Sequence, residues 1–595
     1  MPYILGSFGV HCNSDYIKKM STIALREGSE KTLQTMPLEN GILFAGYKRD
    51  ENYQYDRIMP LPAHQGIMVG KLFDRDHYND VHFNDELAHN FINDPKKISA
   101  SCWGRYSGAL YNKTTKAITL IRDPQGLSTL FYSVIPGGIL FSTELALLYA
   151  ALEHKPAIDM TYFAHYLIHT NHALASTPFE GIKELLPGMS LRMDSHGECS
   201  HELLWDTSGL HGSFITDPKN VEEELLATLR SCTKAWVGQA PGVCVQLSGG
   251  TDSSGLMLLL RDVLPASTKL IAVNYIDSKT QSSNEIEYAQ EIADICDSLL
   301  YFLDSQASSL FDKLPQNFLP NRPSTLLLSF NSSRQLNELA IQHNCPEIMN
   351  GQGGDHVFLA PPPKYALADY WLERGIRDIT SPLNTLSGIY RAPWLSLVHD
   401  NAKAVTSYYR NSRYIKREET PYLDKNFINK LEPQDFYLNT ILKNFHPGKA
   451  THIESLCHAV SYSERDQSSL HSCLTHPLLS QPVIELGLKI PTYQSFHDGY
   501  DRIFFRRAVS RLKNSKSLWR RIKGQTTGSV VKECASHAHE IRDILLHGKL
   551  IASGMIHRHW YEQEITKIQH GYSENIWPIL HLLTAELWFK QWQLD

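Results

Sequence analysis

Hydrophobic and polar positions follow one pattern in the first third of the chain. Up to about Trp205, short alternating runs such as 117–121 are separated by turn residues. A period of two residues places alternate side chains on one face, so these runs predict β-strands. The segment 206–213, with two Ser and two Gly among its eight residues, is typical of a linker. We therefore place a domain boundary there, with domains at 1–210 and 215–595.

A second pattern begins near Val221, where helical periods alternate with short apolar runs. This order predicts right-handed crossovers and a parallel sheet. After 361–363, a run of three prolines, the pattern becomes mostly helical. The elements expected before that point are helices at 222–235, 252–262 and 285–296, and strands at 243–247 and 270–274.

A glycine turn joins the strand at 243–247 to the next helix. Gly249 and Gly250 let the main chain approach a ligand, and the free amides of the helix start suit an anion. Hydroxyl groups surround this turn and add donors. The residues expected to bind a phosphate chain are Ser248, Gly249, Gly250, Asp252, Ser253 and Ser254.

Asp252 lies in the same turn and would repel a polyphosphate unless a cation lay between them. It is therefore predicted to bind Mg²⁺. The alternative is an ordinary strand-to-helix turn capped by Asp252 and Ser253.

A second turn, at 351–355, has three glycines in four positions and ends at Asp355. Ligands of parallel sheets bind beyond the carboxyl ends of the strands, so this turn and the one at Ser248 are expected to face one cleft. Asp252 and Asp355 would then share one magnesium ion. The alternative is a surface loop without function. His356, which follows, would either steer a substrate or make a structural hydrogen bond.

The pattern Ser-Gly-Gly-x-Asp-Ser at 248–253 resembles the pyrophosphate loop (PP-loop) of the ATP-pyrophosphatase superfamily. That resemblance implies ATP as cofactor, adenylylation of a carboxylate or carbonyl oxygen, and release of pyrophosphate. The loop at 351–355 is similar to that of asparagine synthetases, but Gln352 stands where they have a glutamate. Glutamine cannot ionise, so proton removal from an attacking amine must fall elsewhere. The run 353–358 is most similar to lasso-peptide cyclases, the macrolactam synthetases.

The first 210 residues resemble a glutaminase domain of the Ntn type, through the runs 108–111, 122–126, 130–132 and 141–144. The family's cysteine nucleophile is replaced by Pro2, and its oxyanion asparagine by Val69. Glutamine hydrolysis should therefore fail. The expected fold class is α/β: an N-terminal glutaminase-like β-sandwich without its nucleophile, then a parallel-sheet PP-loop domain with a helical C-terminal region.

By the same resemblance, Leu247, Val273 and Gly351 would line the nucleotide pocket. The alternative for all three is plain core packing, and for Leu247 and Val273 both roles can hold together.

Arg502 and Arg506 lie four residues apart, where like charges repel slightly, so an anionic ligand would explain their spacing. Arg502 is similar in position to a lysine that stabilises pyrophosphate in asparagine synthetases, which implies a catalytic role. Lys523 is a weaker candidate for that role. The alternative is a solvated helix face.

Charge and cysteine content exclude several classes of protein. With 57 basic and 63 acidic residues, the net charge of −6 argues against general nucleic-acid binding. The ten cysteines include no Cys-x-x-Cys pair, which fits a reducing cytoplasm. No apolar run reaches the roughly 18 residues of a membrane span.

The leading hypothesis is an AMP-forming lasso-peptide cyclase. It would adenylylate a side-chain carboxylate of a ribosomal peptide, and the peptide's N-terminal amine would close the ring. The expected partners are a precursor or core peptide, a leader peptidase and a leader-recognition protein. Two alternatives stay open: an asparagine or β-lactam synthetase-like ligase for a small acid, and a non-catalytic ATP-binding scaffold of a peptide-maturation complex.

Overall fold

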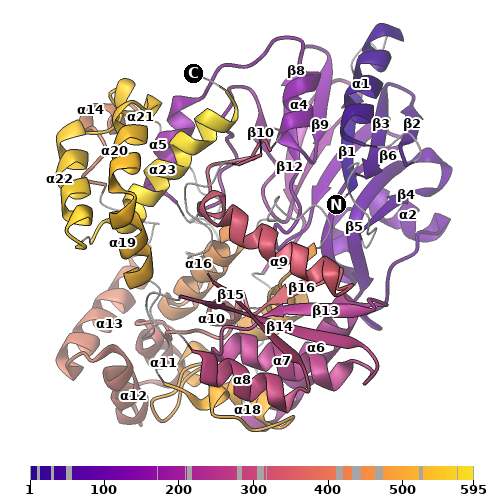
Figure 1. Cartoon of the computed structure of the whole chain (residues 1–595). Coiled ribbons are helices and arrows are strands. Elements are labelled where there is room, and N and C mark those ends of the chain that lie inside the picture. The colour runs from indigo at the N-terminus through magenta and orange to yellow at the C-terminus, as the bar shows by residue number, and fades with distance from the viewer. Residues whose placement is uncertain are drawn as a thin grey trace.

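The computed structural model describes most of the chain (Figure 1). The described residues are 2–9, 14–28, 32–47, 56–170, 172–207, 210, 217–277, 285–304, 314–315, 318–410, 420–431, 442, 444–462, 473–521, 527–572 and 574–593. The predicted linker at 206–213 lies mostly outside this set, and the domain boundaries stay predictions.

Two six-stranded antiparallel sheets form the N-terminal sandwich. The first, in the order β10-β8-β9-β1-β3-β2, comprises β1 (Pro2–Phe8), β2 (Gln34–Leu38), β3 (Gly41–Tyr47), β8 (Phe131–Ile135), β9 (Gly138–Ser142) and β10 (Lys183–Glu184). The second, in the order β12-β11-β7-β6-β5-β4, comprises β4 (Arg57–Pro60), β5 (Gly66–Asp74), β6 (Cys102–Asn112), β7 (Ala117–Arg122), β11 (Met189–Met193) and β12 (Cys199–Leu203).

Alternate residues of these strands pack into different layers. In β1, Ile4 enters the core between the sheets, whereas Tyr3 and Leu5 face outward against helices. This alternation builds four layers, with helices outside both sheets. The helices are α1 (Ser14–Glu27) and α4 (Leu145–Ala151) over the first sheet, α2 (Asp85–Asn93) and α3 (Lys96–Ser101) over the second, and α5 (Met160–Ile168). The sequence pattern predicted strands here but missed these helices.

A five-stranded parallel sheet forms the second half, in the order β15-β14-β13-β16-β17. Its strands are β13 (Gly242–Gln246), β14 (Lys269–Ile276), β15 (Leu299–Asp304), β16 (Glu347–Asn350) and β17 (Cys473–Thr475). The helices among them are α6 (Pro218–Val237), α7 (Thr251–Val263), α8 (Ile286–Ile295) and α9 (Phe330–Gln342). The parallel sheet and the elements predicted from 222 to 296 are confirmed to within a few residues. The strand order reverses between β13 and β16, which makes their carboxyl ends a topological switch point.

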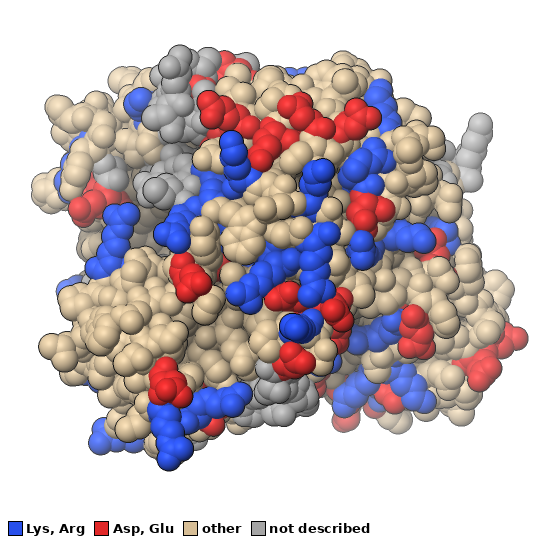
Figure 2. All heavy atoms as spheres, turned by 90° about the horizontal axis from the view of Figure 1, so that it is seen from below, with Lys and Arg blue, Asp and Glu red and all other residues tan. Residues whose placement is uncertain are grey.

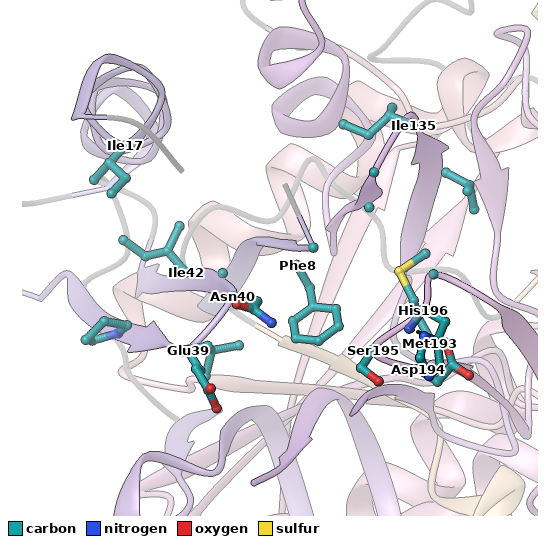
Figure 3. Close-up of a pocket in the computed structure, with 18 residues that line it drawn as sticks. Phe8, Ile17, Glu39, Asn40, Ile42, Ile135, Met193, Asp194, Ser195 and His196 are labelled. Atoms are coloured by element: carbon teal, nitrogen blue, oxygen red, sulfur yellow. Dashed lines mark hydrogen bonds between the residues drawn. The ribbon is translucent and has the colours of Figure 1, made fainter. Parts of the chain in front are cut away.

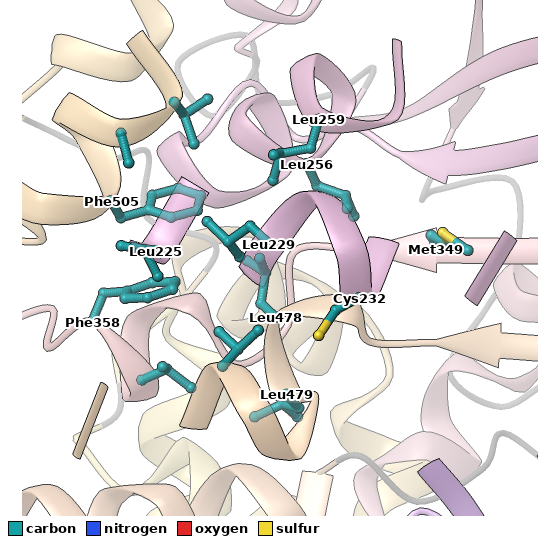
Figure 4. Close-up of a cluster of buried hydrophobic side chains, with 14 of the residues drawn as sticks. Leu225, Leu229, Cys232, Leu256, Leu259, Met349, Phe358, Leu478, Leu479 and Phe505 are labelled. Carbon is teal, nitrogen blue, oxygen red and sulfur yellow. The ribbon is translucent and has the colours of Figure 1, made fainter. Parts of the chain in front are cut away.

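One large apolar cluster holds α6 and α7 against this sheet (Figure 4). Leu229 and Cys232 of α6 meet Leu256 of α7, and Met349 of β16 joins them. Each of these side chains is at most 1% exposed. The helix that follows the first glycine turn is therefore fixed on the sheet by packing.

The remaining chain is mostly helical, as predicted, apart from β17. Its helices are α10 (Gly354–Val357), α11 (Ala366–Arg374), α12 (Thr380–Tyr390), α13 (Trp394–Tyr409), α14 (Lys425–Ile428), α16 (Pro447–Tyr462), α17 (Gln481–Lys489), α18 (Ile503–Ser510), α19 (Thr527–Ser536), α20 (Ala538–Leu546), α21 (Lys549–Ala552), α22 (Arg558–Gln569) and α23 (Ile576–Gln591). Short 3-10 turns are η1 (Pro62–His64), η5 (Thr325–Ser329), η6 (Pro477–Leu479), η7 (Thr492–Gln494) and η8 (Ser517–Trp519).

The C-terminal helices return to the N-terminal half, where α23 lies beside α5 (Figure 1). Phe163 of α5 packs on Trp588 and Phe589 of α23, with ring centroids 5.5 and 4.4 Å apart. The Trp588 indole also donates to the carbonyl of Pro320 at 2.8 Å. Helix α5 of the N-terminal half and the C-terminal helix α23 therefore share one apolar cluster.

Acidic and basic side chains are interspersed on the face that carries α18 and α8 (Figure 2). Ion pairs such as Arg230–Asp262, at 2.6 Å, match this mixture. Within the described residues, no helix has the length and apolar character needed to cross a membrane.

Candidate functional site

The first glycine turn lies between β13 and α7. Gly249 has φ 77°, and a Cβ there would lie 3.0 Å from the carbonyl oxygen of Glu285, so only glycine fits without strain. The Ser248 and Ser253 hydroxyl oxygens are 3.1 Å apart, and the Gly250 amide donates to Ser248 Oγ at 3.3 Å. Ser248 is exposed to solvent. The hydroxyl and amide donors of this turn gather at the start of α7.

The second glycine turn packs directly on the first. β13 and β16 pair in parallel with Gln246 opposite Asn350, so both turns leave the same edge of the sheet. A Cβ on Gly351 would lie 2.6 Å from the amide nitrogen of Ser253, and one on Gly354 would lie 2.5 Å from Asp252 Oδ1. The absence of side chains at these two glycines lets the turns touch and form one site.

Arg502 joins the two aspartates. Its Nη1 donates to Asp252 Oδ2 at 2.8 Å and also to Asp355 Oδ1. Burial opposes the charge of this guanidinium, but the attraction of Asp252, Asp501 and Asp355 outweighs it and raises the pKa of Arg502. Arg502 is therefore a permanent cation between the two carboxylates.

Arg502 and Arg506 differ from the expected pair of exposed helical residues. Arg502 precedes α18 with a left-handed backbone, φ 50°. The solvated-face alternative is wrong for both, since they are only 8% and 2% exposed. Arg506 binds Asp501 Oδ1 at 2.7 Å and the carbonyl oxygen of Arg520 at 3.2 Å, so it anchors the loop after α18.

Arg520 supports the first turn and was not predicted. It donates to the carbonyl of Gly249 at 3.2 Å and to Glu285 Oε1 at 2.5 Å. Its guanidinium also lies 4.3 Å from the ring centroid of Tyr288. The signal was present in the basic run at 520–523, from which Lys523 was chosen. Lys523 lies outside the described residues, so its role stays a prediction.

Buried amide and imidazole groups hold the strand ends. Asn274 donates to the carbonyl of Leu247 at 2.7 Å. Asn350 Oδ1 accepts from the Gln352 amide at 3.1 Å and lies 2.7 Å from His476 Nδ1. These residues were missed because their partners come from distant segments.

Leu247 and Val273 are fully buried, and the Leu247 amide donates to the Val273 carbonyl at 2.8 Å. Their side chains belong to two apolar clusters, so core packing is confirmed. Their role in lining a nucleotide pocket stays a prediction.

The residues of the turns fit a nucleotide with a divalent ion. Ser254 is fully buried, and its hydroxyl has no hydrogen-bond partner among the described residues. Beside it, two carboxylates converge at a helix start with hydroxyls around them, which is an oxygen-donor set of the kind Mg²⁺ prefers. Asp252 and Asp355 are the residues that would hold that ion, in exchange for part of their contact with Arg502.

The segment 69–74, where the resemblance to glutaminase domains implies an oxyanion element, lies in strand β5. Val69 of β5 is 1% exposed in the core between the sheets. The next residue but one, Lys71, forms a buried ion pair of 2.5 Å with Glu347 of β16. The apolar side chain of Val69 cannot donate a hydrogen bond. Lys71 is already paired with Glu347 of the C-terminal half.

A separate cleft of about 690 Å³ lies where β1 ends in the N-terminal domain (Figure 3). Phe8 stands between Asn40 on one side and Ser195 on the other. The lining includes neither glycine turn. This cleft is therefore distinct from the site at the switch point.

Comparisons with known proteins bear on both halves. The sequence model of the family described as asparagine synthase matches residues 224–590, and that of a glutamine amidotransferase domain matches residues 85–204. An amidase of Penicillium rubens, chyE, is 23% identical over 224 residues, which cover 34% of this chain and 32% of the amidase. The match thus spans about a third of that relative.

Two solved structures are similar to parts of the chain. An NH3-dependent NAD synthetase from Campylobacter jejuni has 16% identity and a TM-score of 0.19, covering 34% of this chain and 100% of that one. The allosteric regulatory enzyme of purine biosynthesis has 9% identity and a TM-score of 0.23, covering 53% of this chain and 82% of that one.

Proposed function

We propose that this chain, an ATP-dependent amide-forming ligase that belongs to the asparagine synthase family, splits ATP into AMP and pyrophosphate while it activates a carboxylate. The observation that carries the proposal is the contact of the two glycine turns. Gly351 and Gly354 pack on Asp252 and place both aspartates at one switch point. A single site of this kind suits a polyphosphate that breaks at its inner anhydride.

The substrate carboxylate attacks the α-phosphorus and forms an acyl-adenylate, and pyrophosphate leaves. An amine then attacks the acyl carbon, and AMP leaves together with one proton. Arg502 and the amides at the start of α7 stabilise negative charge on the departing group. Mg²⁺ held by Asp252 and Asp355 would supply further neutralisation of that charge.

Ammonia from glutamine is not the proposed source of the amine. Val69 replaces the oxyanion asparagine and is buried between the sheets. Lys71 is held by Glu347. We propose that the amine belongs to the substrate or is taken directly from solution.

For the substrate we propose a ribosomal peptide that closes into a macrolactam. Support comes from the similarity of the run 353–358 to lasso-peptide cyclases. In that reaction a side-chain Asp or Glu is adenylylated and the N-terminal amine of the same peptide displaces AMP. The proposed partners are the precursor or core peptide, its leader peptidase and a leader-recognition protein.

The test incubates the full chain with ATP, Mg²⁺ and a leaderless peptide that carries an N-terminal amine and an internal Asp or Glu. The expected products are AMP, pyrophosphate and a peptide lighter by one water, measured by chromatography and mass spectrometry. Parallel reactions offer aspartate with ammonium or with glutamine. Amide formation only with a small acid would replace the peptide by the small-molecule alternative, and ADP as product would overturn the chemistry.

Asp252→Asn should lower the rate of AMP formation by about a hundredfold or more, because the site loses one of its two carboxylates. Asp262→Asn is the matched control on the same helix, since Asp262 pairs with Arg230 at the surface. No AMP formation by either the parent chain or Asp252→Asn, with equal binding of both to a maturation protease, would instead support the scaffold alternative.

A further inference from the structure

We propose that His172, Glu454 and His458 bind a divalent transition-metal ion of the zinc class, at the junction of the N-terminal half with α16. The three residues each offer one ligand atom, and these atoms lie within 4.8 Å of one another. Two imidazole nitrogens and one carboxylate oxygen are a donor set that Zn²⁺ accepts.

The chain brings these ligands together from two distant segments. Glu454 and His458 are four residues apart on α16, so they project from the same side of that helix. His172 follows the end of α5. The rings of His172 and His458 lie 4.8 Å apart, nearly perpendicular at 81°. Two of the three ligands are therefore already in contact across the two segments.

To bind an ion, the three ligand atoms would have to move only slightly closer together. Bonds of about 2.0–2.2 Å to a tetrahedral ion set its ligand atoms about 3.4 Å apart. Half-buried side chains with rotatable bonds can close the rest of the 4.8 Å span. Three protein ligands leave one coordination position for water.

Such an ion would stiffen the support of the second glycine turn. On α16, Ser455 Oγ lies 2.8 Å from His356 Nδ1, and His452 Nε2 donates to the carbonyl of Val357 at 3.1 Å. His356 and Val357 belong to α10, which also carries Asp355. Fixing α16 to the segment after α5 would therefore limit the movement of Asp355.

This ligand set differs from the predicted magnesium site. Asp252 and Asp355 offer oxygen atoms alone, which suit Mg²⁺, whereas imidazole nitrogen favours a softer ion. The two sites are consequently separable by metal type. The zinc-class site also stands if the proposed reaction fails.

The experiment strips the full chain with EDTA, removes the chelator, and titrates it with Zn²⁺ or Co²⁺. We expect one equivalent of Zn²⁺ by elemental analysis after desalting, a rise in melting temperature, and visible absorption bands with Co²⁺. His458→Ala and Glu454→Gln should each weaken binding by at least about tenfold. Glu454→Gln keeps the side-chain shape, so it separates ligation from folding.

His154→Ala is the control, because His154 is exposed and outside the cluster. It should bind Zn²⁺ as the parent chain does. Substoichiometric Zn²⁺ in the parent chain, or equal affinity in the two ligand variants and the parent, would overturn the proposal.

Discussion

Gly351 lies against the backbone of the first turn, and alanine there should push the two turns apart. The new Cβ would lie 2.6 Å from the Ser253 nitrogen and 2.8 Å from the Asp252 carbonyl carbon, both backbone atoms. We expect Gly351→Ala to lower the free energy of unfolding by about 1–3 kcal/mol and to slow AMP formation. Urea denaturation and pyrophosphate release measure the two effects.

Gly388→Ala provides a control of opposite sign. Gly388 lies inside α12, and a Cβ there meets no atom within 4 Å. Alanine should stabilise the chain by about 0.5–1 kcal/mol without changing activity. Equal stability changes in the two variants would show that the close approach at Gly351 has no energetic importance.

The sequence identified some of the site's residues for physical reasons that hold in any parallel sheet. Asp252 and Asp355 each follow a strand, and the carboxyl ends of neighbouring parallel strands meet at one edge. The contact of Arg502 with both aspartates could not be predicted from the sequence. It depends on the left-handed backbone of Arg502, which lies far from both aspartates along the chain. Arg520 belongs to a basic run that was noticed, but its contacts with the Gly249 carbonyl and Glu285 come from a distant segment and could not be predicted.

Helix α21 begins at a carboxylate from α23, which makes its stability sensitive to pH. Glu586 accepts from the amides of Lys549 and Leu550 at 2.9 and 2.8 Å. Burial raises the pKa of Glu586 from 4.5 to about 7, against those hydrogen bonds. Folding therefore favours the protonated form of Glu586. The stability that this preference contributes is complete below about pH 4.5 and is lost as pH rises to about 7.

This contribution of Glu586 to the free energy of unfolding is about 3 kcal/mol. Glu586→Gln cannot titrate and should flatten the fall in stability between pH 5 and pH 8, as measured by urea denaturation. Glu562→Gln, in the exposed pair with Arg558, should keep the parent's pH dependence. A parent-like slope in Glu586→Gln would contradict the assignment.

Elements with strong local signals were predictable. The helix from 222 to 235 was found, and its true start at Pro218 carries an Asp217 cap that could have extended the prediction. The sequence pattern did not reveal the helices of the sandwich. In α1, for example, only a narrow stripe that includes Met20 and Ala24 is buried. β17 has three residues within a helical region, and only its pairing with β16 makes it a strand.

The two halves of the molecule are joined by a buried ion pair, and its loss should be costly. Lys71 Nζ donates to Glu347 and, at 3.2 Å, to the carbonyl of Trp236. Lys71→Met leaves Glu347, which is fully buried, without its cation. We expect a loss of about 3–5 kcal/mol in the free energy of unfolding. Calorimetry or urea denaturation measures it.

Adding Glu347→Gln to Lys71→Met should restore most of that loss, because no charge remains buried. Lys116→Met is the matched control, since its 2.6 Å pair with Glu39 is half exposed. Its effect should stay below about 1 kcal/mol. A double variant as unstable as the single one would show that lost packing, not charge, dominates.

The position of β17 in the sheet has a consequence for biosynthesis. Glu347 of β16 pairs with Cys473, so the edge of the sheet stays open until the ribosome has added well over a hundred further residues. His476, whose ring contacts Asn350, is also synthesised after β16. A nascent chain released before that point would present an unprotected strand edge to its neighbours, which invites aggregation. The contact that holds Asn350 at the switch point can thus form only after residue 476 has been synthesised.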